Sequence, residues 1–403
     1  MIVVVGAGPA GIAAALRAQE CGARVTVIDD NPNPGGQIWR GDDENSWVAR
    51  FRSSGIPLLS STRVVAVDVE ARSLLVETDG VSGRLSWKKL VLATGSRELF
   101  LPFPGWTLPG VFGVGGLQAL AKTHLPVAGK RIVLGGTGPL LLAVGAYLRQ
   151  HGADVKLIAE QANIQSLAGF APELLRHPRK VLQGASLQWA IAGTPYRTGC
   201  WIDSAEGVNK LERVTVRSGR DIWTEDCDYA GVAWGLTPNT ELLESLGPEP
   251  EDVYVAGSGE VDLSFVEGEI AGLNAAGYPE RTVLLAPKLE KARGFAAALA
   301  TTFALRDELR HLAKPDTIVC RCEDVTYGEL RKFTSFRAAK LQTRCGMGPC
   351  QGRICGPANE FLFGWETGTV RPPVFPAKIA TLFSDAPLPA DTTGQPDTKE
   401  ITS

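Results

Sequence analysis

The sequence lacks an uninterrupted hydrophobic segment long enough to suggest a membrane-spanning helix. Its longest apolar run, Ile132–Leu148, is rich in glycine and contains Pro139, which favours a strand, a turn and a helix instead. Basic residues are not in excess, since the formal net charge is −3 over 403 residues. Such a balance argues against an overall basic field that would attract nucleic acid or an anionic membrane. We therefore expect no nucleic-acid partner and no membrane span.

Other common features are also missing. The chain enters a hydrophobic strand at Ile2 without a positively charged leader, which predicts no secretory signal and a cytoplasmic location, with peripheral attachment to the inner membrane left open. In a reducing compartment the eight cysteines are not expected to form disulfides. Residues 36–60 contain no cysteine, which argues against the dithiol of disulfide reductases. The four histidines are scattered without a nucleophile–base pattern, so we assign no catalytic residue to this chain.

Two segments, residues 2–30 and 131–160, follow one βαβ pattern. Each contains a β-branched apolar run, a glycine-rich turn, an amphipathic helical stretch and a second apolar run. Such units build parallel sheets covered by helices. The pattern predicts an α/β protein with two Rossmann-like dinucleotide-binding domains.

The first glycine-rich turn is GAGPAG at residues 6–11. Gly6 permits a tight turn, Gly8 lets the backbone approach a pyrophosphate, and Gly11 lets the helix pack closely on the strand. Asp29 follows about 20 residues on, where an acid can accept a hydrogen bond from a ribose hydroxyl. The alternative is a glycine-rich turn without a ligand, but the flanking strands, the helix and the acid favour a nucleotide site.

The second turn departs from this pattern. Gly136 and Gly138 are present, but Leu141 replaces the third glycine and is expected to push the helix away from the strand. Glu160 ends the second strand, where it could bond a ribose. Two interpretations stay equally open here: a second nucleotide bound within residues 131–160, or a βαβ unit that is only architectural.

Five of the eight cysteines lie between residues 318 and 355. Cys320 and Cys322 form a C-x-C pair, Cys350 and Cys355 form a C-x4-C pair, and Cys345 lies between the pairs. Four thiolates suit either a [2Fe–2S] cluster or tetrahedral zinc. A C-x-C spacing is atypical of structural zinc, so an iron–sulfur cluster is favoured, with zinc or buried free thiols as the alternatives.

The motif GAGPAG, the segment DDNPNPGGQIW at residues 29–39 and the segment ATGSRE at residues 93–98 together resemble the FAD domain of the two-dinucleotide-binding flavoproteins. The resemblance implies FAD as a cofactor. It implies these FAD-binding residues: Gly6, Gly8, Pro9, Ala10, Gly11, Asp29, Asp30, Gly35, Gly36, Gln37, Val64, Ala93, Thr94, Gly95, Gly257 and Ser258. In that family an aspartate usually occupies the position of Ser258, so the chain supplies a hydroxyl there instead of a charge.

The segments CRCEDVT and TRCGMGPCQGRIC resemble the [2Fe–2S] module of the bacterioferritin-associated-ferredoxin (BFD) type. The form is that of a flavoprotein subunit in multi-subunit amino-acid dehydrogenases, a group that includes opine oxidases, hydroxyproline dehydrogenases and hydrogen cyanide synthase. LPFPGWTLPGV at residues 101–111, GPLLL at 138–142 and RPP at 371–373 are similar to the same group. The resemblance implies cluster ligation by Cys320, Cys322, Cys350 and Cys355, with Cys345 in reserve.

These observations predict the following domains: an FAD domain at residues 1–106 and 235–312, interrupted by an NAD(P)-like domain at 107–234, then a small helical BFD-like [2Fe–2S] module at 313–383 and a disordered tail at 384–403.

The resemblance implies a redox subunit of a dye- or quinone-linked dehydrogenase for an imino acid such as hydroxyproline, or for an opine. Its partners would be a catalytic flavoprotein subunit of the amino-acid oxidase type and, as an open option, a further small subunit. Two rival functions remain: a stand-alone NAD(P)H-dependent acceptor reductase, and a scaffold subunit that has lost FAD.

Overall fold

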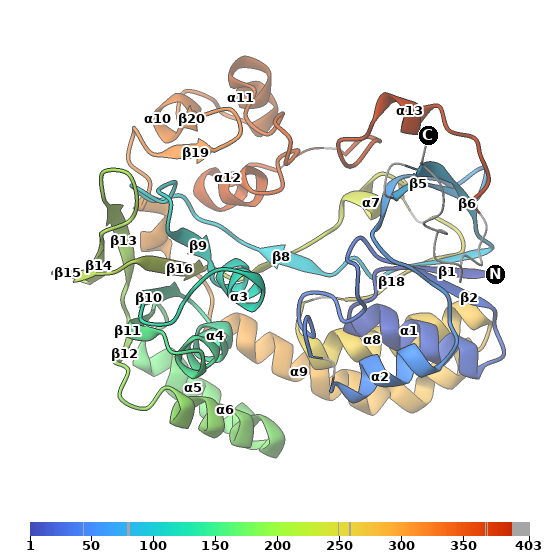
Figure 1. Cartoon of the computed structure of the whole chain (residues 1–403), viewed down its shortest axis with the longest axis horizontal. Coiled ribbons are helices and arrows are strands. Elements are labelled where there is room, and N and C mark those ends of the chain that lie inside the picture. The colour runs from blue at the N-terminus through green and yellow to red at the C-terminus, as the bar shows by residue number, and fades with distance from the viewer. Residues whose placement is uncertain are drawn as a thin grey trace, which may run out of the picture. The chain divides into compact units, whose positions relative to one another are not determined.

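The structure, a computed structural model, describes residues 1–42, 44–78, 81–248, 250–257, 259–366, 368 and 370–388. The chain divides into two compact units (Figure 1). The first contains residues 1–96, 238–292 and 369–403, and the second contains residues 97–237 and 293–368. Each unit is built on a five-stranded parallel sheet, which confirms the expected α/β fold with two Rossmann-like halves. Within the described residues, no helix is long and apolar enough to cross a membrane.

The sheet of the first unit has β1 at its centre. All four residues of β1 are buried, and Ile2 pairs in parallel with Val25 on one side and Lys89 on the other. The strand order is β18-β7-β1-β2-β3. The strands are β1 (Ile2–Val5), β2 (Val25–Ile28), β3 (Leu58–Leu59), β7 (Lys89–Leu92) and β18 (Val253–Val255).

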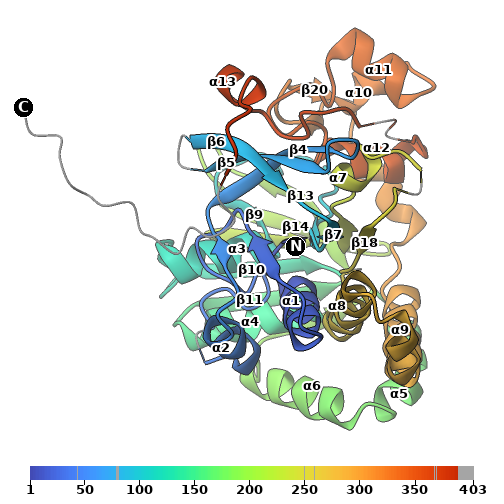
Figure 2. The same ribbon diagram turned by 90° about the vertical axis from the view of Figure 1, so that its right-hand side faces the viewer.

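Helices α1 (Pro9–Glu20) and α8 (Val261–Ala276) lie side by side in the first unit (Figure 2). They approach so closely that a β-carbon on Gly268 would lie 2.1 Å from the carbonyl oxygen of Ala10, and one on Gly272 would lie 2.4 Å from that of Ala14. Only glycine allows this contact. The other helices of the unit are α2 (Ser46–Ser53), α7 (Glu241–Glu244), η1 (Pro279–Leu285), the first part of α9 (Ala286–Thr302) and α13 (Ile379–Leu382).

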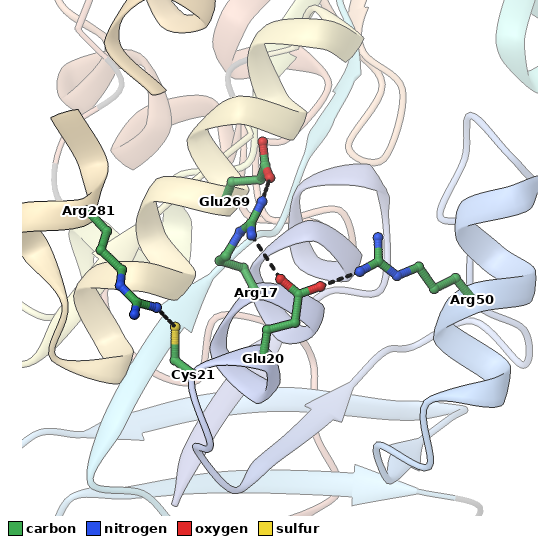
Figure 3. A network of polar contacts seen from close by, with 6 residues as sticks. All are labelled: Arg17, Glu20, Cys21, Arg50, Glu269 and Arg281. Carbon is green, nitrogen blue, oxygen red and sulfur yellow. Dashed lines mark hydrogen bonds and ion pairs between the residues drawn. The ribbon is translucent and has the colours of Figure 1, made fainter. Parts of the chain in front are cut away.

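A network of polar side chains joins the C-terminal end of α1 to α8 and α2 (Figure 3). Arg17 of α1 forms ion pairs with Glu269 of α8 and, at 2.8 Å, with Glu20. Glu20 also pairs with Arg50 of α2. Arg281 donates to the sulfur of Cys21 over 3.7 Å. Glu269 is nearly buried, so its partner Arg17 is what makes a carboxylate tolerable between the helices.

An antiparallel sheet of β4 (Thr62–Asp68), β5 (Ser73–Thr78) and β6 (Val81–Ser86) completes the first unit. The C-terminal segment packs on it, contrary to two expectations. Val374, placed by the sequence in the cysteine module, is buried and donates its N–H to Val65 over 2.9 Å. Residues 384–388, expected to begin a disordered tail, lie along β6, where Arg84 donates to Ala386 over 2.8 Å. Val374 is apolar and gains by burial in the first unit. Residues 384–388 pair with β6 because that strand lies at the edge of its sheet and has unpaired backbone groups. The rest of the expected tail, residues 389–403, lies outside the described residues.

The second unit has the strand order β12-β11-β10-β16-β9. Its parallel strands are β9 (Val111–Gly113), β10 (Arg131–Gly136), β11 (Asp154–Glu160), β12 (Tyr196–Thr198) and β16 (Tyr229–Ala233). Its helices are α3 (Val114–Thr123), α4 (Pro139–Gln150), α5 (Ile164–Leu175), α6 (Pro178–Ala190) and the end of α9, with η2 (Asp307–His311). An antiparallel sheet consists of β13 (Trp201–Glu206), β14 (Arg213–Ser218) and β15 (Asp221–Asp226). Strands β8 (Ser96–Glu98) and β17 (Leu236–Pro238) pair where the chain passes between units.

The cysteine region belongs to the second unit by its contacts. It contains β19 (Ile318–Cys320), β20 (Val325–Thr326), α10 (Tyr327–Leu330), α11 (Phe336–Thr343) and α12 (Cys355–Phe363). Thr326 and Glu329 form a capping box that starts α10. Trp106, buried in the core of the second unit, donates its indole N–H to the carbonyl of Ile318 over 2.6 Å. The cysteine region is therefore anchored directly to the second Rossmann-like sheet.

Candidate cofactor sites

Four separated segments of the first unit meet at the carboxyl end of its sheet. A β-carbon on Gly6 would lie 2.2 Å from the carbonyl oxygen of Ala93, and one on Gly36 would lie 2.9 Å from the Cα of Gly8. Gly257, at the end of β18, lies against Ala10, with 3.5 Å from its ideal β-carbon position to the β-carbon of Ala10. These are the backbone segments that the sequence predicted to gather around one nucleotide.

The first turn of α1 is built to accept an anion. Gly8 caps the helix without a side-chain hydrogen bond, Pro9 follows it, and the first turn contains no acidic residue. The amide groups of this turn and the positive end of the helix dipole are therefore available for a phosphate. A β-carbon on Gly11 would lie 1.8 Å from the carbonyl oxygen of Gly6, so only glycine keeps the helix this close to the strand.

Asp29 lies at the end of β2, as predicted, and is almost fully buried. One carboxylate oxygen accepts the N–H of Ala7, and the other accepts both N–H donors of Asn31, each over 2.7 Å. A carboxylate oxygen can accept more than one hydrogen bond, so the oxygen facing Ala7 retains capacity for a ribose hydroxyl. The position and accepting capacity of the Asp29 carboxylate thus fit the adenosine half of FAD.

Asn239 holds the Ala93–Gly95 segment, although the sequence analysis did not single it out. It accepts from the Thr94 hydroxyl over 2.7 Å through its carbonyl, donates its side-chain N–H to the Thr94 carbonyl over 2.9 Å, and donates its backbone N–H to Gly95 over 2.9 Å. The turn-forming sequence Thr-Pro-Asn-Thr at residues 237–240 is the only local signal that could have indicated it.

The remaining predicted residues are placed less centrally. Gly35 is buried and Gln37 is exposed in the turns after β2, and Asp30 is exposed next to Asp29. Val64 lies in β4 with its side chain in the core. Ser258 lies outside the described residues.

The second glycine-rich turn differs from the first in the burial of its acid. Glu160 is completely buried and accepts hydrogen bonds from the Thr137 hydroxyl over 2.9 Å, the Gly138 N–H over 2.8 Å and the Ala162 N–H over 2.8 Å. Burial raises the pKa of Glu160. Leu141 is buried in the core of the unit, consistent with a helix that stands off the strand.

Residues after α9 close over this same turn. The carbonyl of Phe303 accepts from Thr137 over 3.3 Å, and that of Ala304 accepts from the side chain of Gln161 over 3.0 Å. Glu160 therefore has no exposed surface, and residues after α9 bond its neighbours Thr137 and Gln161. The geometry favours the architectural interpretation of the second βαβ unit.

The five clustered cysteines come together around the end of β19 and the start of α12. The sulfur atoms of Cys320, Cys345 and Cys355 all lie within 4.8 Å of one another, and all three residues are buried. Cys322 is exposed and Cys350 is half-buried. A β-carbon on Gly348 would lie 2.2 Å from the β-carbon of Cys322, so glycine is required for the loop to approach the turn after β19.

A cavity of about 500 Å³ separates the five cysteines into two classes. Cys320, Cys322, Cys350 and Cys355 line it, whereas Cys345 does not. Cys345 instead accepts a hydrogen bond over 3.5 Å from the side chain of Asn359, which is completely buried. The four lining cysteines are the four predicted ligands, whereas the closely spaced sulfur group contains Cys345 and neither Cys322 nor Cys350. The remaining wall is mainly apolar, and its residues include Phe100, Trp106, Val111, Phe112 and Ile354.

The three closely spaced thiols are hydrogen-bonded to one another. Hydrogen bonds from Cys345 and Cys355 lower the pKa of Cys320, and the same contacts with Cys320 raise the pKa of Cys345 and of Cys355. One thiolate is thus stabilised by two protonated neighbours.

Arg97 and Glu98, in the ATGSRE segment, form hydrogen bonds within the second unit. Arg97 donates to the carbonyl of Arg353 in the cysteine loop over 3.0 Å. Glu98 accepts the N–H groups of Gly115 over 2.8 Å and Gly116 over 3.0 Å at the start of α3. Burial raises the pKa of Glu98. The sequence analysis assigned neither role, because both contacts join residues distant along the chain.

Comparison with known proteins places these sites in context. The family model of the pyridine nucleotide-disulphide oxidoreductases matches residues 1–262. An opine oxidase subunit from Rhizobium meliloti is 31% identical to the chain, over 94% of this chain and 97% of that protein. Hydrogen cyanide synthase subunit HcnB of Pseudomonas protegens is 29% identical, over 88% of this chain and 89% of that protein.

Among solved structures, L-proline dehydrogenase from P. horikoshii is similar, with a TM-score of 0.65 and 20% identity over 94% of this chain and 78% of that chain. At this identity the likeness concerns the fold.

Proposed function

The chain belongs to the pyridine nucleotide-disulphide oxidoreductase family, and from this premise we propose that it is the electron-transfer subunit of a heteromeric amino-acid dehydrogenase. It would hold FAD in the first unit and a [2Fe–2S] cluster in the cysteine region. When bound, these groups supply the electron-accepting and electron-releasing chemistry between a partner's substrate site and an external acceptor. The protein's contribution is to position them and to set their surroundings.

The four cysteines that share one cavity carry this proposal. A [2Fe–2S] cluster needs four thiolate ligands. Four cysteines line the cavity, namely Cys320, Cys322, Cys350 and Cys355, and the fifth cysteine of the region does not. The apolar wall around them lowers the local dielectric, and the backbone amides of the glycine-rich loop can donate to sulfur. We assign ligation to these four residues and a supporting position to Cys345.

For FAD, the support is the convergence of the 6–11, 35–36, 93–95 and 257 segments at the free end of α1. We propose Gly8, Ala10 and Gly11 against the pyrophosphate and Asp29 on the ribose. Gly35, Gly36 and Gln37 would then lie towards the flavin, with Thr94 and Gly95 opposite.

The partner and the substrate class are proposed from the relatives. Two relatives that match nearly the full chain are named as subunits of an opine oxidase and of hydrogen cyanide synthase. By analogy, a catalytic flavoprotein subunit of the amino-acid oxidase type would oxidise the C–N bond of an imino acid such as hydroxyproline, or of an opine. A dye or quinone would then be the acceptor. A stand-alone NAD(P)H reductase is less favoured because Glu160 is completely buried and the carbonyls of Phe303 and Ala304 bond the residues around its turn.

The test is an absorption spectrum of anaerobically purified protein with iron, sulfide and flavin determined on the same sample. We expect about two irons and two sulfides per chain and one extractable FAD. Zinc in place of iron, with no visible absorbance beyond the flavin, contradicts the cluster assignment. Iron and sulfide without flavin contradict the FAD assignment and favour the scaffold alternative.

A further inference from the structure

Helices α5 and α6 carry an apolar stripe that is exposed along its whole length. The positions follow a heptad-type spacing of four and three residues, and every one of them is exposed and non-polar. They are Ile164, Ala168, Ala171 and Leu175 on α5, then Pro178, Leu182, Ala185 and Trp189 on α6. We call this set the α5–α6 stripe; Figure 2 shows the two helices that carry it. Its large side chains are 66% (Ile164), 72% (Leu175), 71% (Leu182) and 84% (Trp189) exposed.

The stripe does not hold the hairpin to its own unit. That contact is made by the opposite face, where Phe170 meets Phe295 at 5.7 Å between ring centroids and His177 meets Phe295 at 4.6 Å. Leu187 packs against the buried core that contains Ile191. Neither α5 nor α6 has a buried residue, yet α5 is among the most apolar helices of the second unit. Folding of the chain therefore gives no reason for the stripe to be apolar.

The spacing identifies the kind of occupant. Positions i, i+4, i+7 and i+11 form the narrow seam along which one helix packs on another. Ala168 and Ala171 lie between Ile164 and Leu175, and Ala185 lies between Leu182 and Trp189, which leaves spaces for the side chains of a facing helix. A lipid surface favours a broader apolar face, so a helical protein segment fits the stripe better than a membrane does.

Charge separates a different polypeptide from a second copy of this chain. Residues 164–189 contain one acidic residue, Glu173, against Arg176, Arg179 and Lys180. Glu173 is already paired with Arg176 over 2.8 Å and with His177 over 3.3 Å. An antiparallel twofold pairing centred near residue 176 would bring the arginines of both copies together, which is unfavourable.

We propose that the α5–α6 stripe is the docking surface for the catalytic partner subunit. The partner would present a helix with an apolar seam flanked by acidic residues. This inference rests on the proposed function for the identity of the partner. It adds the surface by which that partner is held and the chemistry of the matching segment.

Crosslinking from the full-length chain in its source cells tests the surface. A photoreactive p-benzoylphenylalanine replaces Trp189 in one variant and Val208 in a control; Val208 is 83% exposed and belongs to the turn between β13 and β14. We expect position 189 alone to crosslink to a helical, acid-flanked segment of a polypeptide that copurifies with amino-acid or imino-acid dehydrogenase activity. Crosslinks from 189 to this same chain or to lipid, or equal crosslinking from both positions, overturn the proposal.

A charge variant supplies the second measurement. The double substitution Leu182→Glu and Trp189→Glu should weaken binding of the purified partner at least about thirtyfold, as expected for loss of a tryptophan hot spot, while Val208→Glu leaves it unchanged. The iron content and the unfolding midpoint should stay at wild-type values. Unchanged partner binding by the double variant overturns the docking proposal. Absence of iron and flavin from the wild-type protein overturns the proposed function instead, so the two failures are distinguishable.

Discussion

The backbone N–H of Gly138 donates a 2.8 Å hydrogen bond to the carboxylate of Glu160, at the turn where the second Rossmann-like half would meet a nucleotide. In the first half the corresponding acid, Asp29, is hydrogen-bonded in the same way, with Ala7 donating to one carboxylate oxygen and Asn31 to the other. The two acids differ in burial instead: Glu160 has no exposed surface, whereas Asp29 is 6% exposed. This difference has direct consequences for reduced nicotinamide nucleotides.

Addition of NADH or NADPH to the anaerobic protein should leave the flavin oxidised, because the second turn is closed by Glu160 and by the carbonyls of Phe303 and Ala304. Dithionite, which needs no binding site, serves as the positive control. The measurement is stopped-flow absorbance near the flavin maximum. Stoichiometric bleaching by either nucleotide would instead support the acceptor-reductase alternative.

Glu160 should also give the stability of the protein a defined pH dependence. Burial raises the pKa of Glu160 in the folded state, so the folded protein binds a proton more tightly than the unfolded chain does. Its contribution to stability is therefore greatest at low pH and falls as the pH rises above the ordinary value of 4.5. Glu160→Gln should cost about 1–3 kcal/mol, because an amide nitrogen then faces an N–H donor, and the cost should shrink as the pH rises.

Urea unfolding of wild type and Glu160→Gln across this range provides the measurement. The exposed Glu212→Gln is the control, with an expected effect within about 0.5 kcal/mol. A cost that grows as the pH rises would show that the pKa of Glu160 is lowered, contrary to the prediction.

One substitution should have opposite effects at two helical glycines. Gly268→Ala places a β-carbon 2.1 Å from the carbonyl oxygen of Ala10, so we expect a loss of about 1–3 kcal/mol and weaker FAD retention. Gly169→Ala in α5 meets nothing within 4 Å and should gain about 0.5–1 kcal/mol through helix propensity. Chemical unfolding and the FAD content of both variants test this. Equal effects at the two positions would rule out the close α1–α8 contact as the cause.

Serine substitution of each clustered cysteine should separate ligands from neighbours. Cys320→Ser, Cys322→Ser, Cys350→Ser and Cys355→Ser should each lower the iron and sulfide content, since these residues line the shared cavity. Cys345→Ser should keep the iron and alter only the electron paramagnetic resonance spectrum of the reduced protein, because Cys345 contacts Asn359 and Cys320. Loss of iron from Cys345→Ser with retention in Cys322→Ser would reassign the fourth ligand.

Local sequence patterns predicted much of the molecule. The two βαβ units and the strand–turn–helix at Gly6–Gly11 rest on residues adjacent in sequence, whose periodicity and turn chemistry act locally. The end of α9 at Thr302 is different, because Phe303 and Ala304 turn to bond Thr137 and Gln161. That termination depends on partners more than a hundred residues away.

By itself, then, the amino-acid order determined which short segments form strands, turns and helices, and which residue types were available to hold FAD and iron. Tertiary structure alone decided that Glu160 is completely buried while Asp29 keeps a small exposed fraction, that Cys345 does not line the cavity shared by the other four thiols, and that Asn239 secures Thr94. The physical reason is that burial and hydrogen-bond saturation are properties of three-dimensional neighbours, which spacing along a chain does not encode.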